Sequence, residues 1–217
     1  MKHPFKPTEE PLSWDDMAIH ETPISRRALL GGAAVVVAAP ALGAPDPAGP
    51  SPRLVEAARA ALDRHADRIV HRQLVAIADY SLHSALPRFF LYAPGSGAVT
   101  ALRVAHGRGS DPAHSGWLQR FSAQPGSAAS SAGAYLTGAA YVGQHGHSRR
   151  LIGLDPDNAT AEARAIVIHG AWYCEPSVVQ QTGKLGRSEG CFAFSAADAA
   201  LVLNRLGPGH LIFSGRA

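Results

Sequence analysis

Two residues of the chain, Cys191 and His169, have the side chains that covalent acyl chemistry needs. His169 ends the apolar run A-I-V-I-H, and Cys191 follows a glycine in the segment G-R-S-E-G-C. Only a few per cent of free cysteine side chains are ionised at neutral pH, so a cysteine nucleophile needs a base such as histidine. The two residues are too far apart in the sequence to meet by local geometry. Only a fold that joins neighbouring strand ends can bring them together.

A nucleophile of this kind also needs backbone donors for the oxyanion of the intermediate. Gly190 precedes the cysteine, and we expect the N–H groups of Gly190 and Cys191 to face one point. Gly170 follows His169, where its small size lets another segment approach. On residue type alone, a structural cysteine and a satisfied histidine are the commoner interpretation. The surrounding chain has to decide between the two.

The pattern of apolar residues and turn formers predicts a mainly β domain with two helices, one at each end. Ser51 is the expected cap of the first helix, and Ser195 is the expected cap of the second, which runs to Leu206. The expected strands cover residues 74–80, 88–92, 98–104, 134–138, 140–143, 150–154, 163–169 and 210–213. His169 then ends a strand, and Cys191 lies in a Gly/Ser-rich loop before the second helix.

The first 44 residues have the pattern of an export signal. Arg26 and Arg27 precede an apolar segment, residues 28–39, and Ala/Gly-rich sequence follows it. A twin arginine in this setting is typical of a Tat-type signal, and the segment is short of the ~20 residues that span a bilayer. We therefore expect a signal at 1–44, a Pro/Gly-rich linker at 45–52 and a domain at 53–217. The expected location is the periplasm, with no stable membrane span after signal removal.

Charge and cysteine content limit the other classes. The net charge is +3, but no run of Lys and Arg marks a nucleic-acid site. The histidines, including His145 and His147, lack the carboxylate or cysteine spacing of a metal centre, so we expect no metal and no cofactor. The two cysteines, Cys174 and Cys191, leave one alternative open. An exported protein can pair them in a disulfide, which would block a nucleophile.

Several ordered motifs resemble the murein L,D-transpeptidase catalytic domain family, a variant branch of the YkuD type. His169-Gly170 followed by Ser188-Glu189-Gly190-Cys191 resembles its H-G … [ST]-x-G-C signature. The segments H-G-R-G-S-D-P at 106–112, G-Q-H-G at 143–146 and I-V-I-H-G-A-W-Y at 166–173 agree with the same branch. The resemblance covers about residue 74 to the C-terminus. It implies an L,D-transpeptidase-like β-sandwich with a few peripheral helices.

The resemblance also implies a reaction. Cys191 would attack a stem tetrapeptide of peptidoglycan and release D-Ala, and an acceptor amine from a second stem would resolve the thioester. His169 would be the base, oriented by the Gly170 carbonyl or by Ser188. Arg187 could hold a substrate carboxylate, Gly190 would serve the oxyanion, and His145 and Tyr135 are candidate substrate contacts, although packing is the commoner role for such a tyrosine. Carbapenem-type inhibitors would acylate the same thiol.

Three positions depart from the best-known form of the motif. Glu189 stands where that form has histidine, Ala193 where it has a polar residue, and Cys174 where an apolar residue is expected. Two alternatives follow. The same site could use water as acceptor, as an L,D-carboxypeptidase does, or the chain could be a non-catalytic wall-binding module with a Cys174–Cys191 disulfide.

Overall fold

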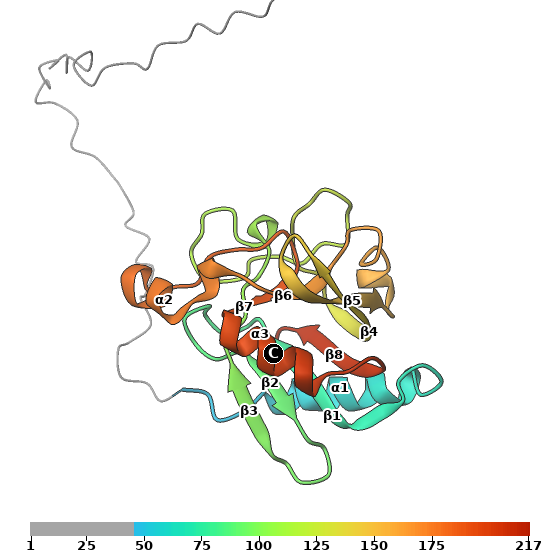
Figure 1. Cartoon of the computed structure of the whole chain (residues 1–217). Helices are drawn as coiled ribbons and strands as arrows, with labels where there is room; N and C mark the ends of the chain where they lie inside the picture. Colours follow the sequence, from blue (N-terminus) through green and yellow to red (C-terminus); the bar gives the residue numbers. More distant parts are fainter. Residues whose placement is uncertain (1–45) are drawn as a thin grey trace, which may run out of the picture. The chain divides into compact units, whose positions relative to one another are not determined.

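The structure is a computed structural model that describes residues 46–217. Within them, eight strands form one mixed sheet in the order β3-β2-β1-β8-β4-β5-β6-β7 (Figure 1). Their bounds are β1 His71–Asp79, β2 Phe89–Tyr92, β3 Val99–Leu102, β4 Gly133–Gly143, β5 Gly146–Gly153, β6 Val167–Gly170, β7 Phe192–Phe194 and β8 His210–Gly215. The predicted mainly β fold is confirmed. The expected signal at 1–44 lies outside the described residues.

The sheet curls until its two ends face each other. Phe89 of β2 packs edge-on against Phe194 of β7, with ring centroids 4.9 Å apart, although the two strands lie near opposite ends of the strand order. The backbone N–H of Ala105, just after β3, donates to the Ala193 carbonyl of β7 at 2.9 Å. The main apolar core therefore lies between two halves of one sheet, which gives the expected sandwich-like layers.

The described residues also form three α-helices: α1 Pro52–Arg64, α2 Pro176–Thr182 and α3 Ala196–Arg205. The predicted caps of α1 and α3 are confirmed, since Ser51 accepts from the Leu54 amide and Ser195 accepts from the Asp198 amide. Helix α1 buries one apolar face against β1 and β8, on the outer side of the sheet. No helix within residues 46–217 combines the length and apolar character needed to cross a membrane.

The structure corrects the predicted elements in four places. The strands expected over 134–138 and 140–143 are one strand, β4. The expected strand over 163–169 begins only at Val167, because Ala165 has φ +52°, outside the strand region. Helix α2 was not predicted, because its seven residues bury no side chain and carry no apolar period. Strand β7 lies where the sequence predicts a loop, because three residues are too few to show alternation. Its position beside β6 is what places the cysteine.

Candidate active site

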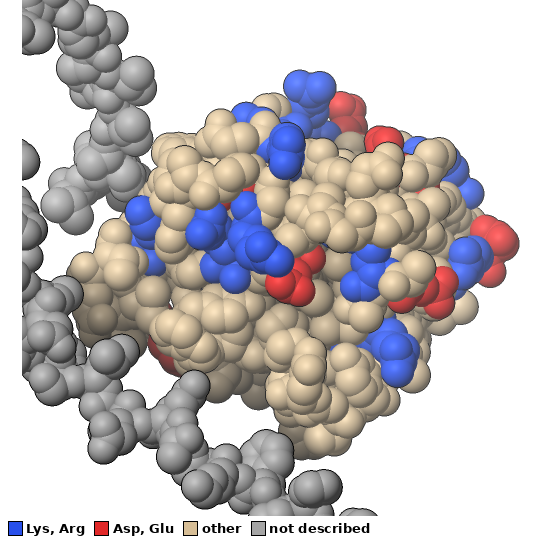
Figure 2. Space-filling model, turned by 90° about the horizontal axis from the view of Figure 1, so that it is seen from above, with Lys and Arg blue, Asp and Glu red and all other residues tan. Residues whose placement is uncertain are grey.

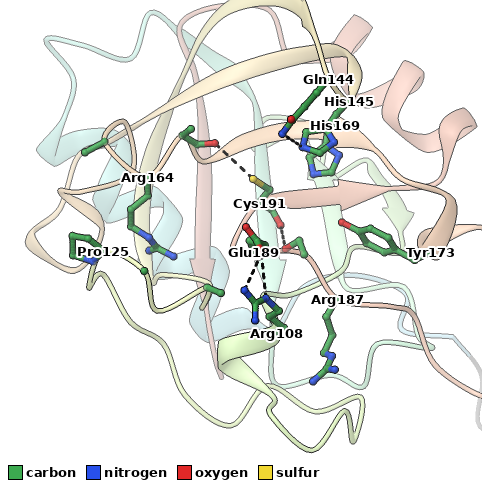
Figure 3. A pocket seen from close by; sticks show the side chains of 15 residues that line it. Arg108, Pro125, Gln144, His145, Arg164, His169, Tyr173, Arg187, Glu189 and Cys191 are labelled. Atoms are coloured by element: carbon green, nitrogen blue, oxygen red, sulfur yellow. Dashed lines mark hydrogen bonds and ion pairs between the residues drawn. The ribbon is translucent and has the colours of Figure 1, made fainter. Parts of the chain in front are cut away.

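Parallel pairing of β6 with β7 brings the cysteine and the histidine to one place. His169 lies opposite Ala193 in register, and Cys191 precedes that partner by two residues. Both side chains line one cavity of about 600 Å³ (Figure 3). Neighbouring strands thus join two residues that the sequence keeps far apart.

The environment of His169 fixes which of its ring nitrogens carries the proton. Nδ1 lies 2.9 Å from the carbonyl oxygen of Gly170. A carbonyl oxygen can only accept, so Nδ1 is the protonated nitrogen and Nε2 keeps its lone pair. Ser188, the other predicted acceptor, instead donates its hydroxyl to the carbonyl of Cys191 at 2.8 Å. The imidazole is therefore oriented by backbone and is ready to accept a proton at Nε2.

His145 covers the face of this imidazole. It lies in the two-residue turn between β4 and β5, and its ring stacks on that of His169 with centroids 4.3 Å apart and planes 23° apart. Burial lowers the pKa of His169, and the charge that His145 can carry lowers it further, while the hydrogen bond to Gly170 raises it. The balance favours the neutral base.

The thiol of Cys191 is half-buried and donates to the backbone carbonyl of Ala165, with sulfur and oxygen 3.7 Å apart. Burial raises the pKa of the Cys191 thiol, and the charge of Glu189 raises it further. A hydrogen bond with the Val167 backbone and the charge of Arg164 lower it. Desolvation is the largest of these causes. The cavity therefore holds a neutral thiol and a neutral imidazole, and a thiol in this state becomes a nucleophile only when it loses its proton.

The chain before the cysteine has a backbone that only glycine adopts readily. Gly190 has φ +113°, and a Cβ there would lie 2.6 Å from the Ala129 carbonyl oxygen and 2.8 Å from Arg164 Nη2. Its N–H donates to the hydroxyl oxygen of Ser188 at 3.1 Å. This corrects the expectation that the Gly190 N–H would stabilise the oxyanion, because that N–H is already bonded to Ser188. Ser188 instead holds the turn that presents the cysteine.

Backbone hydrogen bonds from the H-G-R-G-S-D-P loop, residues 106–112, hold this turn in place. The Ser188 amide donates to the His106 carbonyl at 2.9 Å, and the Arg108 amide donates to the Ser188 carbonyl at 2.7 Å. His106 is buried between Arg88, whose Nη2 lies 2.9 Å from Nδ1, and Asp111, whose Oδ2 lies 3.3 Å from Nε2. An arginine only donates, so the Nε2 of His106 carries the proton and donates to Asp111.

Burial, with help from the Arg88 charge, lowers the pKa of His106 to about 3. This histidine is therefore a neutral structural group at physiological pH. The sequence does not single out Arg88, because an arginine at the start of an expected strand gives no sign that it will be fully buried. Arg88 also donates to the carbonyls of Val104 and Leu82, which joins the start of β2 to the segments that follow β3 and β1.

Charged side chains surround the cavity mouth. Arg108 donates from Nε and Nη2 to one oxygen of Glu189, at 3.2 and 2.9 Å. Arg187 lines the cavity, and its Nη1 donates to the carbonyls of Asp111 and Pro112. Arg164 also lines the cavity and was not predicted, because it lies in a segment assigned to a strand. Arg108, Arg164 and Arg187 thus line the cavity together with Glu189, and Arg108 is the arginine that pairs with this glutamate (Figure 3).

The prediction that Tyr135 contacts the substrate is corrected. The residue is fully buried in the main core, packs against Phe192, and donates its hydroxyl to the Ser131 carbonyl at 3.0 Å. It is not among the side chains that line the cavity. The tyrosine that lines the cavity is Tyr173, which packs over Gly186. The sequence does not single it out as a site residue.

Both cysteines are free thiols in the structure. Cys174 is buried in a small cluster with Ala105, Leu185 and Ala193, and its thiol donates to the Ala193 carbonyl at 3.4 Å. Two of the unusual positions of the motif, Cys174 and Ala193, therefore pack against each other away from the cavity. Within residues 46–217, no three His, Cys, Asp or Glu side chains gather closely enough to hold a metal ion.

The fold and the site describe a mainly β domain with a histidine and a cysteine in one cavity. A model of the L,D-transpeptidase catalytic domain family matches residues 49–214, and the chain belongs to that family. No curated protein sequence matches it.

Solved structures that resemble the chain include L,D-transpeptidases of two mycobacteria. One from Mycobacterium tuberculosis H37Rv is 14% identical, with a TM-score of 0.43 over 66% of this chain and 58% of that one. One from Mycobacterium smegmatis is 15% identical, with a TM-score of 0.41 over 66% and 58%. L,D-transpeptidase 3 from M. tuberculosis, in complex with a faropenem-derived adduct, is 14% identical, with a TM-score of 0.43 over 66% and 60%. The chain spans about three fifths of the length of these proteins.

Proposed function

We propose that the protein is an exported cysteine L,D-transpeptidase that joins peptidoglycan stem peptides in the periplasm. The observation that carries the proposal is the shared cavity of Cys191 and His169, with Nδ1 of the histidine bonded to the Gly170 carbonyl. Family membership supports the reaction class. The twin-arginine segment at residues 25–30 supports export.

Acylation begins when a donor stem peptide enters the cavity. The sulfur of Cys191 attacks the carbonyl carbon of the bond between the diamino acid and the terminal D-Ala, and the thiol proton moves to Nε2 of His169. The tetrahedral intermediate then collapses. The C–N bond breaks, His169 returns the proton to the leaving amine of D-Ala, and a thioester remains on Cys191.

Transfer reverses the roles. An amine of a second stem attacks the thioester carbonyl and gives its proton to His169, and the Cys191 sulfur leaves and regains a proton from the imidazole. The stacked ring of His145 and the Gly170 carbonyl hold the imidazole in one orientation through both half-reactions. With water in place of the amine, the same steps give an L,D-carboxypeptidase.

Mass spectrometry of the intact protein after incubation with a carbapenem tests the nucleophile. We expect one stable adduct on Cys191, none in Cys191→Ala, and acylation slowed by roughly 10²–10⁴-fold in His169→Ala. Cys174→Ala is the matched control and should still form the adduct. A wild-type protein that forms no adduct and contains a Cys174–Cys191 disulfide would instead be the wall-binding module.

Product analysis with a tetrapeptide donor separates transfer from hydrolysis. Crosslinked dimers that need Cys191 establish a transpeptidase, whereas tripeptide without dimers establishes a carboxypeptidase.

Fractionation of cells that produce the full chain tests export. Replacing Arg26 and Arg27 with lysine should leave the protein in the cytoplasm, and periplasmic delivery of that variant would contradict a Tat-type signal.

A further inference from the structure

A separate hollow lies between the β4–β5 hairpin and helix α3. Its volume is about 520 Å³, and none of its lining residues lines the catalytic cavity. Successive side chains of a strand point to opposite faces of a sheet. In β5, Ser148 lies opposite His169 and Arg149 lies opposite Ile168, so Arg149 shares the face of Ile168 and points away from the catalytic imidazole. The hollow, which Arg149 lines, is therefore on the other face of this part of the sheet.

Arg149 is a buried cation without a counter-charge. The residue is 7% exposed, no Asp or Glu lines the hollow, and within residues 46–217 Arg149 forms no ion pair. Burial lowers the pKa of Arg149, and no carboxylate offsets this effect. On the face shown in Figure 2, by contrast, acidic side chains lie beside several of the exposed Lys and Arg side chains. A buried charge is costly unless it is paired, so this hollow favours an anion from outside the chain.

The guanidinium group of Arg149 is held in place before any ligand arrives. Its Nη1 donates to the Gly138 carbonyl at 2.9 Å, and its Nη2 donates to the Leu203 carbonyl at 3.2 Å. Nε is buried and has no acceptor in the described part of the chain. A guanidinium group has five N–H donors, so three of them remain for a ligand. Their planar arrangement suits a carboxylate.

The rest of the hollow is mainly apolar. Four aliphatic side chains line it, two from β4 and two from α3: Ala140, Val142, Ala200 and Leu203. Val142 is 70% exposed, which is unusual for a branched apolar side chain on a strand. His147 and Asn204 add exposed polar groups that can bond the amides of a peptide. The lining thus suits a ligand with an apolar side chain, backbone amides and one negative charge.

We propose that this hollow, the Arg149 hollow, binds the C-terminal end of a partner protein whose last residue is apolar. The terminal carboxylate pairs with Arg149, and the last side chain packs against Val142 and Leu203. The amides before it bond His147 and Asn204, which an acyl chain would leave without partners. Because the hollow shares no residue with the catalytic cavity, the bound partner does not occupy that cavity.

NMR spectroscopy of the ¹⁵N-labelled wild-type protein tests this inference. The probes are the tripeptide acetyl-Gly-Ala-Leu with a free carboxyl end and the same peptide with an amidated end. The free acid should shift the amide signals of residues 140–149 and 200–204. It should also bind roughly tenfold or more tightly than the amide, the scale of one hydrogen bond to a charged group. The measurement needs no acyl-enzyme, so its result is independent of the proposed function.

Two exposed valines supply matched variants. Val142→Asp places a negative charge at the hollow and should weaken binding of the free acid more than binding of the amide. Val70→Asp makes the same change at a side chain that is 69% exposed and outside the hollow, and should alter neither affinity. Arg149→Gln should remove the preference for the free acid. If losing its two hydrogen bonds to carbonyls prevents folding, the Val142→Asp comparison still decides.

Three results would overturn the inference. Equal affinity for the acid and the amide would mean that no charge is recognised. Signals that shift only outside residues 140–149 and 200–204 would place the binding elsewhere. Octanoate that binds as tightly as the free-acid peptide would show a site for apolar acids in general, without recognition of a peptide end.

Discussion

The imidazole ring of His145 stacks on that of His169, with 4.3 Å between centroids, although the two residues come from different strand ends. The β4–β5 turn carries His145 over β6, next to the cavity. Stacking hides one face of the base from water and places a second titratable ring against it. Because burial and the charge of His145 both lower the pKa of His169, the acid limb of the pH–rate profile depends on this contact.

Removing His145 should therefore move that limb. Burial is the largest cause that lowers the pKa of His169, and the charge of His145 adds to it. His145→Ala exposes the base and removes the charge, so both changes raise the pKa of His169. Activity, which needs the neutral base, should then fall at a higher pH than in the wild type. The pH dependence of kcat/KM for D-Ala release measures the limb.

His145→Phe separates the two causes. It keeps an apolar ring over His169 and removes only the charge, so its limb should lie between those of the wild type and His145→Ala. A limb that moves to lower pH in either variant would contradict the contact.

Gly190 should be irreplaceable where it stands. Alanine there has to adopt φ near +113° and brings a Cβ within 2.6 Å of the Ala129 carbonyl oxygen. The backbone cost alone is about 1–3 kcal/mol. We expect Gly190→Ala to lower the free energy of unfolding in urea by at least this amount and to abolish the carbapenem adduct. Gly95→Ala, with open space at its Cβ and no positive φ, is the control and should change neither.

The parts of the site that follow from residue type could be predicted from the sequence. A histidine at the end of an apolar run marks a strand end, and a cysteine after a glycine marks a candidate nucleophile. Ser195 marks the start of α3, because capping is a local interaction. The mainly β class followed from alternation and turn residues. Each of these signals lies within a few residues of the feature that it predicts.

The remaining features depend on contacts between distant segments. Arg88 is fully buried only because Val104, Leu82 and His106 supply acceptors for it, and nothing near residue 88 reveals them. Arg164 reaches the cavity because Ala165 has a positive φ and the expected strand starts late. Tyr135 was placed in the site because an aromatic strand residue has the same sequence pattern whether it faces a core or a pocket.

The two thiols should react very differently with alkylating reagents. Burial raises the pKa of Cys174 to about 12, and the side chain is 3% exposed. Cys191 is half-buried and lines the cavity. Iodoacetamide should therefore modify Cys191 alone in the folded protein and both cysteines in urea. Peptide mapping gives the sites, and labelling of Cys174 at a rate similar to that of Cys191 would be inconsistent with this packing.

The buried His106 should make stability depend on pH. Its pKa is about 3 in the folded protein, against an ordinary value of 6.5, so the unfolded chain binds an extra proton between these values. The contribution of the neutral imidazole is complete above pH 6.5 and is lost as the pH falls toward 3. The slope reaches at most about 1.4 kcal/mol per pH unit.

Urea unfolding at several pH values from 7 to 5 measures this loss. His106→Gln keeps an acceptor for Arg88 and a donor for Asp111 but cannot titrate, so its unfolding free energy should fall less steeply with pH than that of the wild type. The comparison uses the difference between the two slopes, because the other buried groups titrate equally in both proteins. His65→Gln, a half-buried histidine paired with Asp155 on the outer side of the sheet, is the control. Equal slopes for wild type and His106→Gln would mean that His106 is already charged in the folded protein, and the Arg88–His106–Asp111 hydrogen bonds would then have to be reassigned.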